Sequence, residues 1–198
     1  MGYTRSDHRL LQALTERWRP ETNTFHLRHG EMTITLQDVA ILTGLPIDGK
    51  PVTGITDHDD WASVCEELLG VIFLSWLKET FSIVPDVELD DDILQQYARA
   101  YILFVLGSTI FADGTGNKIH ACYLHLFRDF EDAGRYSWGA AALAHLYRAL
   151  YRGSVLGERI VTKDFVPMQL WSWERLHVGR PSLHDPDFIL GDRPLGAR

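Results

Sequence analysis

The sequence predicts a single domain, residues 1–198, that is mainly α-helical and carries a small β-hairpin near its N-terminus. The prediction rests on three observations. No proline occurs between Pro85 and Pro167, and this interval therefore permits long helices. Apolar residues recur at spacings of three and four in several stretches, as on the buried face of a helix. A short alternating pattern between residues 24 and 36 surrounds a turn, as in a hairpin.

The first elements follow from local patterns. An amphipathic helix is predicted over residues 6–17. The hairpin strands are predicted at residues 24–27 and 31–36, because apolar and polar residues alternate there and a His-Gly pair lies between the two runs.

A helix is predicted directly after the hairpin. Thr35 followed by Asp38 is close to a capping box, with Asp in the place of the usual Glu or Gln. Gly44 is predicted to end this helix, because glycine readily adopts the left-handed conformation that closes many helices. The Asp48-Gly49 pair that follows is typical of a type I′ turn.

The rest of the chain is predicted to form helices with short connections. Acidic residues before one of them stabilise the positive N-terminal end of that helix. Ser137 is a plausible N-cap for another, and Pro167 suits the first turn of the last one. The predicted helices are residues 61–80, residues 89–112, a helix from Ser137 onward and Met168 to His177.

Composition restricts the classes of function. The chain has 198 residues, 45% of them hydrophobic, which is enough for one substantial core. The formal net charge of −8 argues against a surface that follows nucleic-acid phosphates over the whole molecule. The charge is uneven, because residues 57–92 hold eleven acids and one base, whereas residues 135–180 hold seven bases and three acids. These segments are either solvated helix faces or partner-facing acidic and basic edges.

Cysteine usage and hydropathy predict an intracellular protein without membrane association. Cys65 and Cys122 are too few for a disulfide scaffold, and no signal peptide begins the chain. The longest apolar run, residues 100–112, is shorter than the roughly 20 residues of a membrane-spanning helix. No Lys/Arg-rich nuclear import signal is visible.

His120, Cys122, His125 and Asp129 suggest a metal site, because closely spaced His and Cys are common zinc ligands. On a helix, His125 and Asp129 would face together, whereas His120 and Cys122 would project apart. A buried cysteine and hydrogen-bonded histidines explain the pattern better. The sequence therefore predicts no metal site.

Residues 35–46 are similar to the first helix and turn of a bacterial helix-turn-helix unit. A recognition helix would have to follow, but Pro46 and Pro51 lie in its place. Sequence-specific DNA binding through this element is therefore not expected, and whether the chain contacts nucleic acid directly stays open.

Residues 16–54, ERWRPETNTFHLRHGEMTITLQDVAILTGLPIDGKPVTG, resemble the plant mobile domain family, and so do residues 111–113, 136–147 and 169–174. The resemblance covers roughly residues 16–180. Because the family is expected to continue further, the chain is interpreted as a domain trimmed at its C-terminal end.

The resemblance implies a nuclear, non-enzymatic domain that acts with a protein partner in plants. Transposable-element silencing, gene-expression control and genome integrity are the implied processes. A phosphatase-like protein of the same family context is the implied partner. The alternatives are a transposon-encoded domain that binds nucleic acid or assists mobility, and a degenerate enzyme.

Members of the family carry labels that mention an aminotransferase or a long-form Ser/Thr phosphatase. A pyridoxal enzyme needs a Schiff-base lysine in an α/β scaffold, a context that is lacking for Lys50, Lys78, Lys118 and Lys163. A metallophosphatase needs clustered Asp, His and Asn ligands, which residues 191–193 do not provide. Residues 114–118 lack the spacing of a phosphate loop. No catalytic residue, no cofactor and no small-molecule substrate are therefore predicted.

The best sequence-level candidates for a partner-binding site are Trp171, Trp173 and Arg175. Residues two apart on a helix point about 200° apart, so the two tryptophans cannot both face the core. Tryptophan and arginine also dominate the energetics of protein interfaces. One exposed indole beside Arg175 is therefore the predicted contact.

Overall fold

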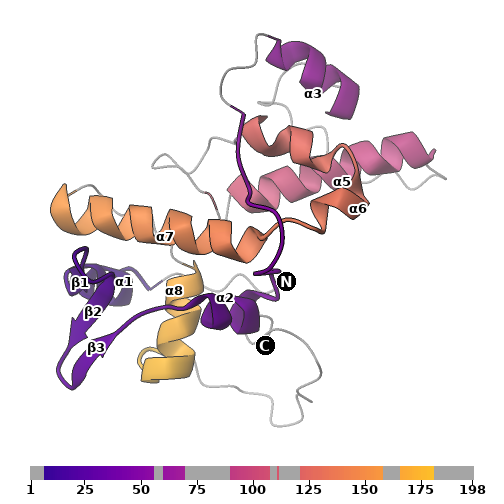
Figure 1. The fold of residues 1–198 in the computed structure, drawn as a ribbon. Helices are drawn as coiled ribbons and strands as arrows, with labels where there is room; N and C mark the ends of the chain where they lie inside the picture. The colour runs from indigo at the N-terminus through magenta and orange to yellow at the C-terminus, as the bar shows by residue number, and fades with distance from the viewer. Residues whose placement is uncertain are drawn as a thin grey trace, which may run out of the picture.

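The computed structural model describes residues 7–55, 60–69, 90–107, 111, 121–157 and 166–180. These residues are mainly helical and form one small antiparallel sheet near the N-terminus, which confirms the predicted fold class. The long helix α7 (Trp138–Val155) lies between two groups of elements (Figure 1). No described helix is long and apolar enough to cross a membrane.

The first group, which we call the N-terminal layer, lies along one side of α7 (Figure 1). It consists of α1 (His8–Thr15), the sheet, α2 (Leu36–Thr43) and α8 (Val166–Trp171). The second group, which we call the central layer, lies on the other side. It consists of α3 (Trp61–Leu69), α5 (Asp91–Val105), the 3₁₀ helix η3 (Ala121–Phe127) and α6 (Phe130–Ala133).

The predicted hairpin is present and a third strand extends it, but its second strand ends at Met32 and does not reach residue 36, where α2 begins. β2 (Thr24–Leu27) pairs antiparallel with β3 (Gly30–Met32), so that Phe25 lies opposite Met32. The additional strand β1 (Trp18–Arg19) pairs with the other edge of β2. Two residues are too short for an alternating pattern, and β1 was therefore not predicted.

The capping box of α2 is also confirmed. The Thr35 hydroxyl accepts a hydrogen bond from the Asp38 backbone N–H at 3.2 Å, and the Asp38 carboxylate accepts one from the Thr35 N–H at 3.0 Å. Gly44 ends the helix with a φ of 73°. The type I′ turn is wrong, because Gly49 has a positive φ but Asp48 does not.

The helices of the central layer differ in part from the prediction. α3 and α5 begin close to their predicted starts, and residues 70–80, 89, 108–110 and 112 of the predicted ranges lie outside the described residues. Ser137 occupies the N-cap position of α7, but its hydroxyl donates to the Ile47 carbonyl at 2.7 Å instead of capping the helix. Ser137 therefore ties α7 to the segment that follows α2.

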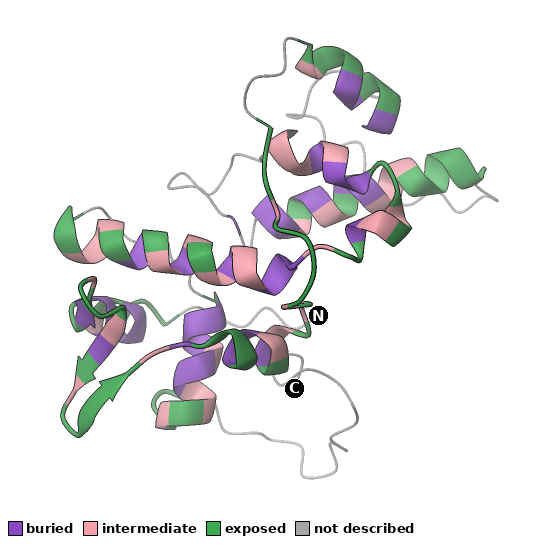
Figure 2. Cartoon of the chain, viewed as in Figure 1, coloured by how far each residue is buried: buried purple, intermediate pink, exposed green. Residues whose placement is uncertain are grey.

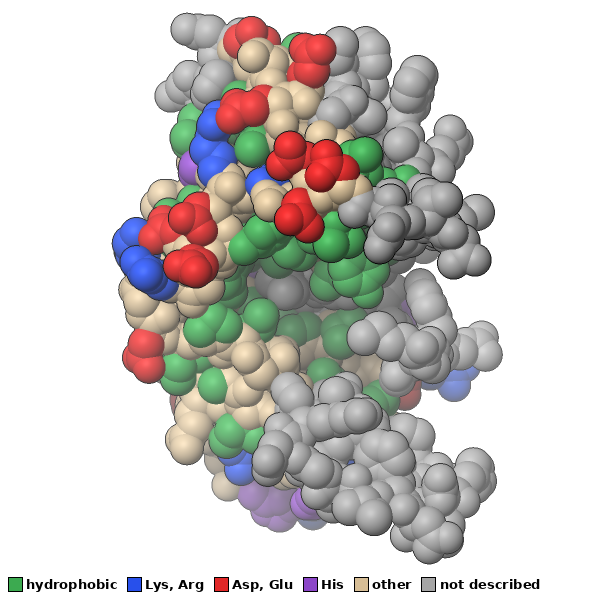
Figure 3. Space-filling view, turned by 90° about the vertical axis from the view of Figure 1, so that its right-hand side faces the viewer, with side chains coloured by type: hydrophobic (Ala, Val, Ile, Leu, Met, Phe, Trp, Pro, Cys, Tyr) green, Lys and Arg blue, Asp and Glu red, His purple; other side chains and the backbone are tan. Residues whose placement is uncertain are grey.

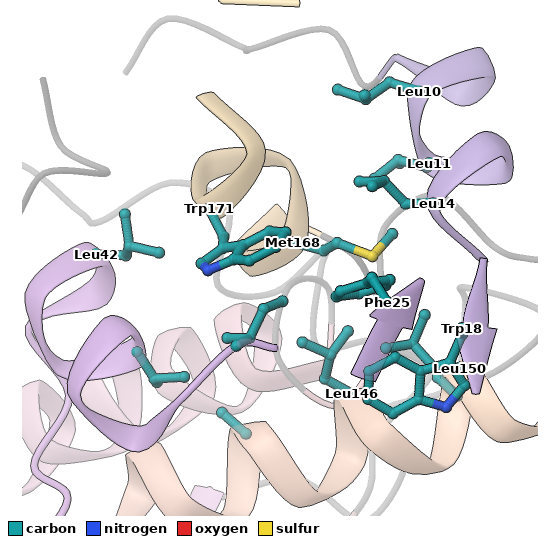
Figure 4. Close-up of a cluster of buried hydrophobic side chains, with 14 residues drawn as sticks. Leu10, Leu11, Leu14, Trp18, Phe25, Leu42, Leu146, Leu150, Met168 and Trp171 are labelled. Atoms are coloured by element: carbon teal, nitrogen blue, oxygen red, sulfur yellow. The ribbon is translucent and has the colours of Figure 1, made fainter. Parts of the chain in front are cut away.

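Two clusters of buried side chains make up the core. The first joins the N-terminal layer to α7, and Figure 4 shows Trp171 and Met168 between α2 and the sheet. The second joins α3, α5 and η3 to the start of α7. Within it, the buried Arg99 of α5 donates to the Leu68 and Phe127 carbonyls, so this guanidinium connects three helices.

The segment between α2 and α3 connects the two layers. Lys50 forms a parallel β-bridge with Tyr136, and its ammonium lies 2.7 Å from the Asp132 carboxylate. Gly139 at the start of α7 packs against Ile47, since an added Cβ would lie 2.8 Å from a methyl carbon of that side chain. The layers therefore share backbone contacts as well as α7.

Candidate functional site at the end of the last helix

The last described helix places the three predicted contact residues. α8 begins with Val166 and Pro167, which needs no N–H partner in the first turn. It continues as a wider π-helical turn, η5 (Ser172–Leu176), and His177 ends this turn in the left-handed conformation with a φ of 55°. The helix therefore ends where it was predicted to end, at His177.

Trp171 lies in the core. Its side chain is 1% exposed, and its ring centroid is 5.3 Å from that of Phe25 (Figure 4). A side chain buried this completely cannot meet a partner without local unfolding. Of the two predicted tryptophans, only Trp173 is therefore available as a contact residue.

Trp173 lies on the other side of the turn and is half-buried. Its indole Nε1 is shielded from solvent and makes no hydrogen bond. The same nitrogen is 3.7 Å from where a Cβ on Gly179 would lie, so the end of this helix covers one edge of the ring. An indole with one covered edge is already held in position for a partner.

Arg175 connects this helix end to the start of α2. Its Nε and Nη2 atoms donate to one oxygen of the Asp38 carboxylate, at 2.8 and 2.6 Å. The other carboxylate oxygen accepts from the Thr35 N–H and hydroxyl, at 3.0 and 2.9 Å. The Asp38 side chain is 7% exposed, whereas half of the Arg175 side chain faces solvent. Arg175 therefore has an intramolecular partner and an exposed surface at once.

These contacts keep Asp38 ionised. Burial alone would raise the pKa of Asp38, because the charged form loses its hydration. The hydrogen bonds from Thr35 and Arg175, together with the positive charge of Arg175, outweigh burial and lower the pKa. The charged Asp38 carboxylate thus holds the start of α2 and the end of η5 together.

The charges near the helix end are paired within the molecule. Arg180 lies 3.4 Å from the Glu174 carboxylate, so both arginines of residues 166–180 have carboxylate partners. Exposed apolar side chains accompany these pairs on α2 and at the ends of α8 and η5: Leu36, Ile41, Val166 and Val178. Trp173 and Arg175 are two residues apart on η5 and therefore point to different sides of it, the indole towards Gly179 and the guanidinium towards Asp38. Tryptophan and arginine side chains that are partly exposed are suited to protein contact.

The structure separates the residues of the suggested metal site. Asp129 caps α6 by accepting from the Glu131 N–H at 2.7 Å, and η3 ends before it. His125 and Asp129 were expected to lie on one helix, but they belong to different elements. His120 lies outside the described residues. In the described ranges, no group of three or more His, Cys, Asp or Glu is placed to hold a metal ion.

The residues considered for catalysis are only partly described. Lys50 is paired with Asp132 and exposed, unlike a lysine prepared for Schiff-base formation. Residues 114–118 and 191–193, and the remaining lysines, lie outside the described residues. The absence of a catalytic role stays a prediction.

Comparison with known families matches residues 2–198 to the family described as Plant mobile domain. The chain belongs to the plant mobile domain family. This membership confirms the resemblance seen in the sequence. No solved structure matches the chain.

Three similar proteins come from Arabidopsis thaliana. Protein MAIN-LIKE 2 is 48% identical over 189 residues, which are 90% of this chain and 28% of that protein. Protein MAINTENANCE OF MERISTEMS is 43% identical over 201 residues, 96% of this chain and 42% of that protein. A Serine/threonine-protein phosphatase 7 long form homolog is 43% identical over 192 residues, 91% of this chain and 14% of that protein. This plant mobile domain therefore spans less than half the length of each relative.

The pairing of Arg175 with Asp38 was missed by sequence reasoning. The two residues are 137 positions apart, and each had been interpreted separately. A single sequence contains no signal for such a long-range pair. The capping box predicted the position of Asp38 but not its second partner.

Proposed function

We propose that this plant mobile domain is a non-enzymatic protein-interaction domain of the plant cell nucleus. It acts there in transposable-element silencing, gene-expression control and genome integrity. The observation that carries the proposal is that Trp173 and Arg175, on different sides of η5, are both held by contacts within the molecule. The indole is held by the segment after η5 and the guanidinium by Asp38, so a partner meets side chains that are already ordered.

The relatives support a role as a module within longer proteins. Proteins with names as different as MAINTENANCE OF MERISTEMS and a phosphatase 7 long form homolog contain a similar segment, and this segment is 42% and 14% of their lengths. A segment shared by proteins with different names is suited to bringing them into common assemblies. We therefore propose a phosphatase-like protein of this family context as the partner.

The pairing of basic side chains favours a protein partner over nucleic acid. Binding to phosphates needs Lys and Arg side chains that are available to release counterions. Four of the described basic residues already contact carboxylates: Lys50, Arg128, Arg175 and Arg180. Together with the net charge of −8, these pairs weaken the case for a DNA-binding or mobility-assisting domain.

Recovery from plant nuclei tests this proposal. The tagged chain, and a Trp173→Ala variant as a control, are expressed in dividing plant tissue and purified from nuclear and cytosolic fractions. We expect the chain in the nuclear fraction, with the phosphatase-like protein co-purifying with the unaltered chain and depleted with the variant. Exclusion from nuclei, or equal recovery of the partner with both proteins, would contradict the proposal.

A further inference from the structure

Helix α5 has an apolar face on the side opposite its buried face. Its buried residues include Ala100 and Leu103, which belong to the second cluster of buried side chains, the one that joins α3, α5 and η3 to α7. At 100° per residue, Leu94, Ala98 and Tyr101 lie on the opposite side of the helix. Leu94 is 52% exposed and Tyr101 is 60% exposed. Both sides of this helix are therefore apolar.

The apolar stripe continues over the length of the helix. Leu94, Ala98, Tyr101 and Val105 follow the spacing i, i+4, i+7 and i+11, and Phe104 lies beside them. Leu94, Tyr101 and Phe104 are exposed, whereas Ala98 and Val105 are half-buried. A helix on the surface of a soluble protein normally carries polar residues on its outer face. Contiguous exposed apolar side chains mark interaction sites. We call this surface the α5 face.

Charge near the α5 face is negative. Asp90, Asp91 and Asp92 begin the helix, and Asp90 and Asp91 lie closest in angle to Leu94 and Tyr101, whereas Asp92 lies on the side of Arg99. Glu66 is on the neighbouring helix α3, where Glu67 is paired with Arg128. The described residues of α3 and α5 include a single basic one, Arg99, whose guanidinium is buried and bonded to backbone carbonyls. Figure 2 shows the exposed N-terminal end of α5, and in Figure 3, viewed from that side, acidic side chains lie directly beside hydrophobic ones.

The charge decides which occupant fits. A second copy packed with its α5 parallel to this one would bring the same aspartates together, and the net charge of −8 on each copy opposes association in either orientation. A helix with Lys or Arg at one end would instead place opposite charges together, while its apolar residues cover those of α5.

We propose that the α5 face is a docking site for an amphipathic helix of another protein, with apolar residues at i, i+4, i+7 and i+11 and a Lys/Arg-rich end that lies beside Asp90 and Asp91. This site is on the central layer, whereas Trp173 and Arg175 are on the N-terminal layer. The two surfaces are thus separate, and failure of one proposal leaves the other standing.

Two designed peptides of about 18 residues, long enough for five helical turns, test the proposal. Both carry leucines at the four stated positions, and one ends in three lysines while the other ends in three glutamates. Fluorescence anisotropy measures the affinity of each labelled peptide for the chain at low and high salt. We expect the basic peptide to bind at least about tenfold more tightly, and this preference to shrink as salt rises.

Matched variants locate the binding surface. Tyr101→Gln should weaken binding of the basic peptide by at least about tenfold, because it removes an exposed aromatic anchor and keeps a helix-forming residue. Tyr151→Gln changes another exposed tyrosine, which is 46% exposed and lies on α7, and should leave the affinity within about twofold. Asp90→Asn with Asp91→Asn should remove the preference for the basic peptide, and Asp90 can be replaced because its side chain makes no capping hydrogen bond. Leu94→Gln replaces Tyr101→Gln if circular dichroism shows that the latter has lost helix.

Three results would overturn the proposal. One is equal affinity for the basic and acidic peptides. A second is unchanged binding in folded Tyr101→Gln and Leu94→Gln variants. The third is self-association, seen by light scattering as a mass that rises with concentration and that Tyr101→Gln abolishes, because the α5 face would then belong to a second copy.

Discussion

At the residue scale, Asp38 connects most of the candidate site. One of its oxygens accepts two hydrogen bonds from Thr35, and the other accepts two from Arg175. The carboxylate thereby joins the first turn of α2 to the last turn of the described chain. A buried carboxylate with four donors is costly to disturb, since any lost donor leaves a charge incompletely solvated.

Replacing Asp38 should therefore destabilise the fold. We expect Asp38→Asn to lower the free energy of unfolding by about 1.5–3 kcal/mol, the range for charged hydrogen bonds. Chemical denaturation measures the change, and Lys50→Gln serves as the control because the Lys50–Asp132 pair is exposed and contributes about 1 kcal/mol or less. Equal effects of the two substitutions would show that burial of the Asp38 carboxylate does not matter.

The lowered pKa of Asp38 predicts a pH dependence. A carboxyl with a pKa below its unfolded value adds stability above the unfolded pKa, near 3.9, and this stability is lost as pH falls through the folded pKa. Unfolding free energies measured from pH 6 down to pH 3 should therefore fall more steeply for the unaltered chain than for Asp38→Asn. Hydrogen bonds from Thr24 and Lys50 lower the pKa values of Glu31 and Asp132 in both proteins, so these contributions cancel. Parallel curves would show that Asp38 does not contribute to the pH dependence of stability.

At the scale of single elements, short-range signals gave reliable predictions. The capping box at Thr35, the glycine at residue 44 and the alternating strands all depend on residues within a few positions of one another, and each is present in the structure. Ser137 differs because its hydroxyl has a distant acceptor, the Ile47 carbonyl. Local chemistry placed this serine at the helix start but could not reveal which partner it prefers.

The Thr35 cap should contribute measurably to stability. Thr35→Ala removes the acceptor for the Asp38 N–H and one donor to its carboxylate, so a loss of about 0.5–2 kcal/mol is expected. For a domain of this size each kcal/mol corresponds to about 2–4 °C in the thermal midpoint. Thr22→Ala, in an exposed turn, is the control and should change the midpoint little. An unchanged midpoint for Thr35→Ala would show that the Thr35 cap does not stabilise the fold.

The candidate site could be predicted only in part, because it also depends on contacts between residues that are distant in the sequence. Helical periodicity showed that Trp171 and Trp173 point to different sides, but not which one is buried. The packing of Trp171 against Phe25 is a contact between distant parts of the chain, and so is the ion pair of Arg175 with Asp38. The α5 face was not predicted, because the exposure of its residues could not be inferred from the sequence. The apolar run over residues 100–112 shows no period that separates a buried side from an exposed one, although Tyr101 is mostly exposed.

At the scale of the whole molecule, two clusters of buried residues are held together by α7 and by the segment after α2. The close approach of this segment to residues 135 and 136 depends on Gly49. Its φ of 114° is strained for other residues, and a Cβ there would lie 2.2 Å from the Arg135 carbonyl oxygen. The glycine therefore permits the backbone contact between the layers.

Adding a methyl group at this position should separate the layers. We expect Gly49→Ala to lower the free energy of unfolding by at least about 2 kcal/mol, from backbone strain and from the clash. Gly30→Ala is a matched control, because Gly30 has a φ of 132° and no atom within 4 Å of an added Cβ, so only strain remains. The difference between the two variants measures the contact between layers. A difference near zero would show that this contact contributes little.

The central claim, that Trp173 forms part of a protein-binding surface, is tested most directly by one affinity comparison. Isothermal titration calorimetry of the purified phosphatase-like partner compares the unaltered chain, Trp173→Ala and Tyr151→Ala, an exposed aromatic on α7. The account predicts binding that Trp173→Ala weakens by at least about 2 kcal/mol, roughly thirtyfold, with an unchanged thermal midpoint and with normal binding by Tyr151→Ala. Absence of binding by the unaltered chain, or equal affinity of a folded Trp173→Ala variant, would contradict it.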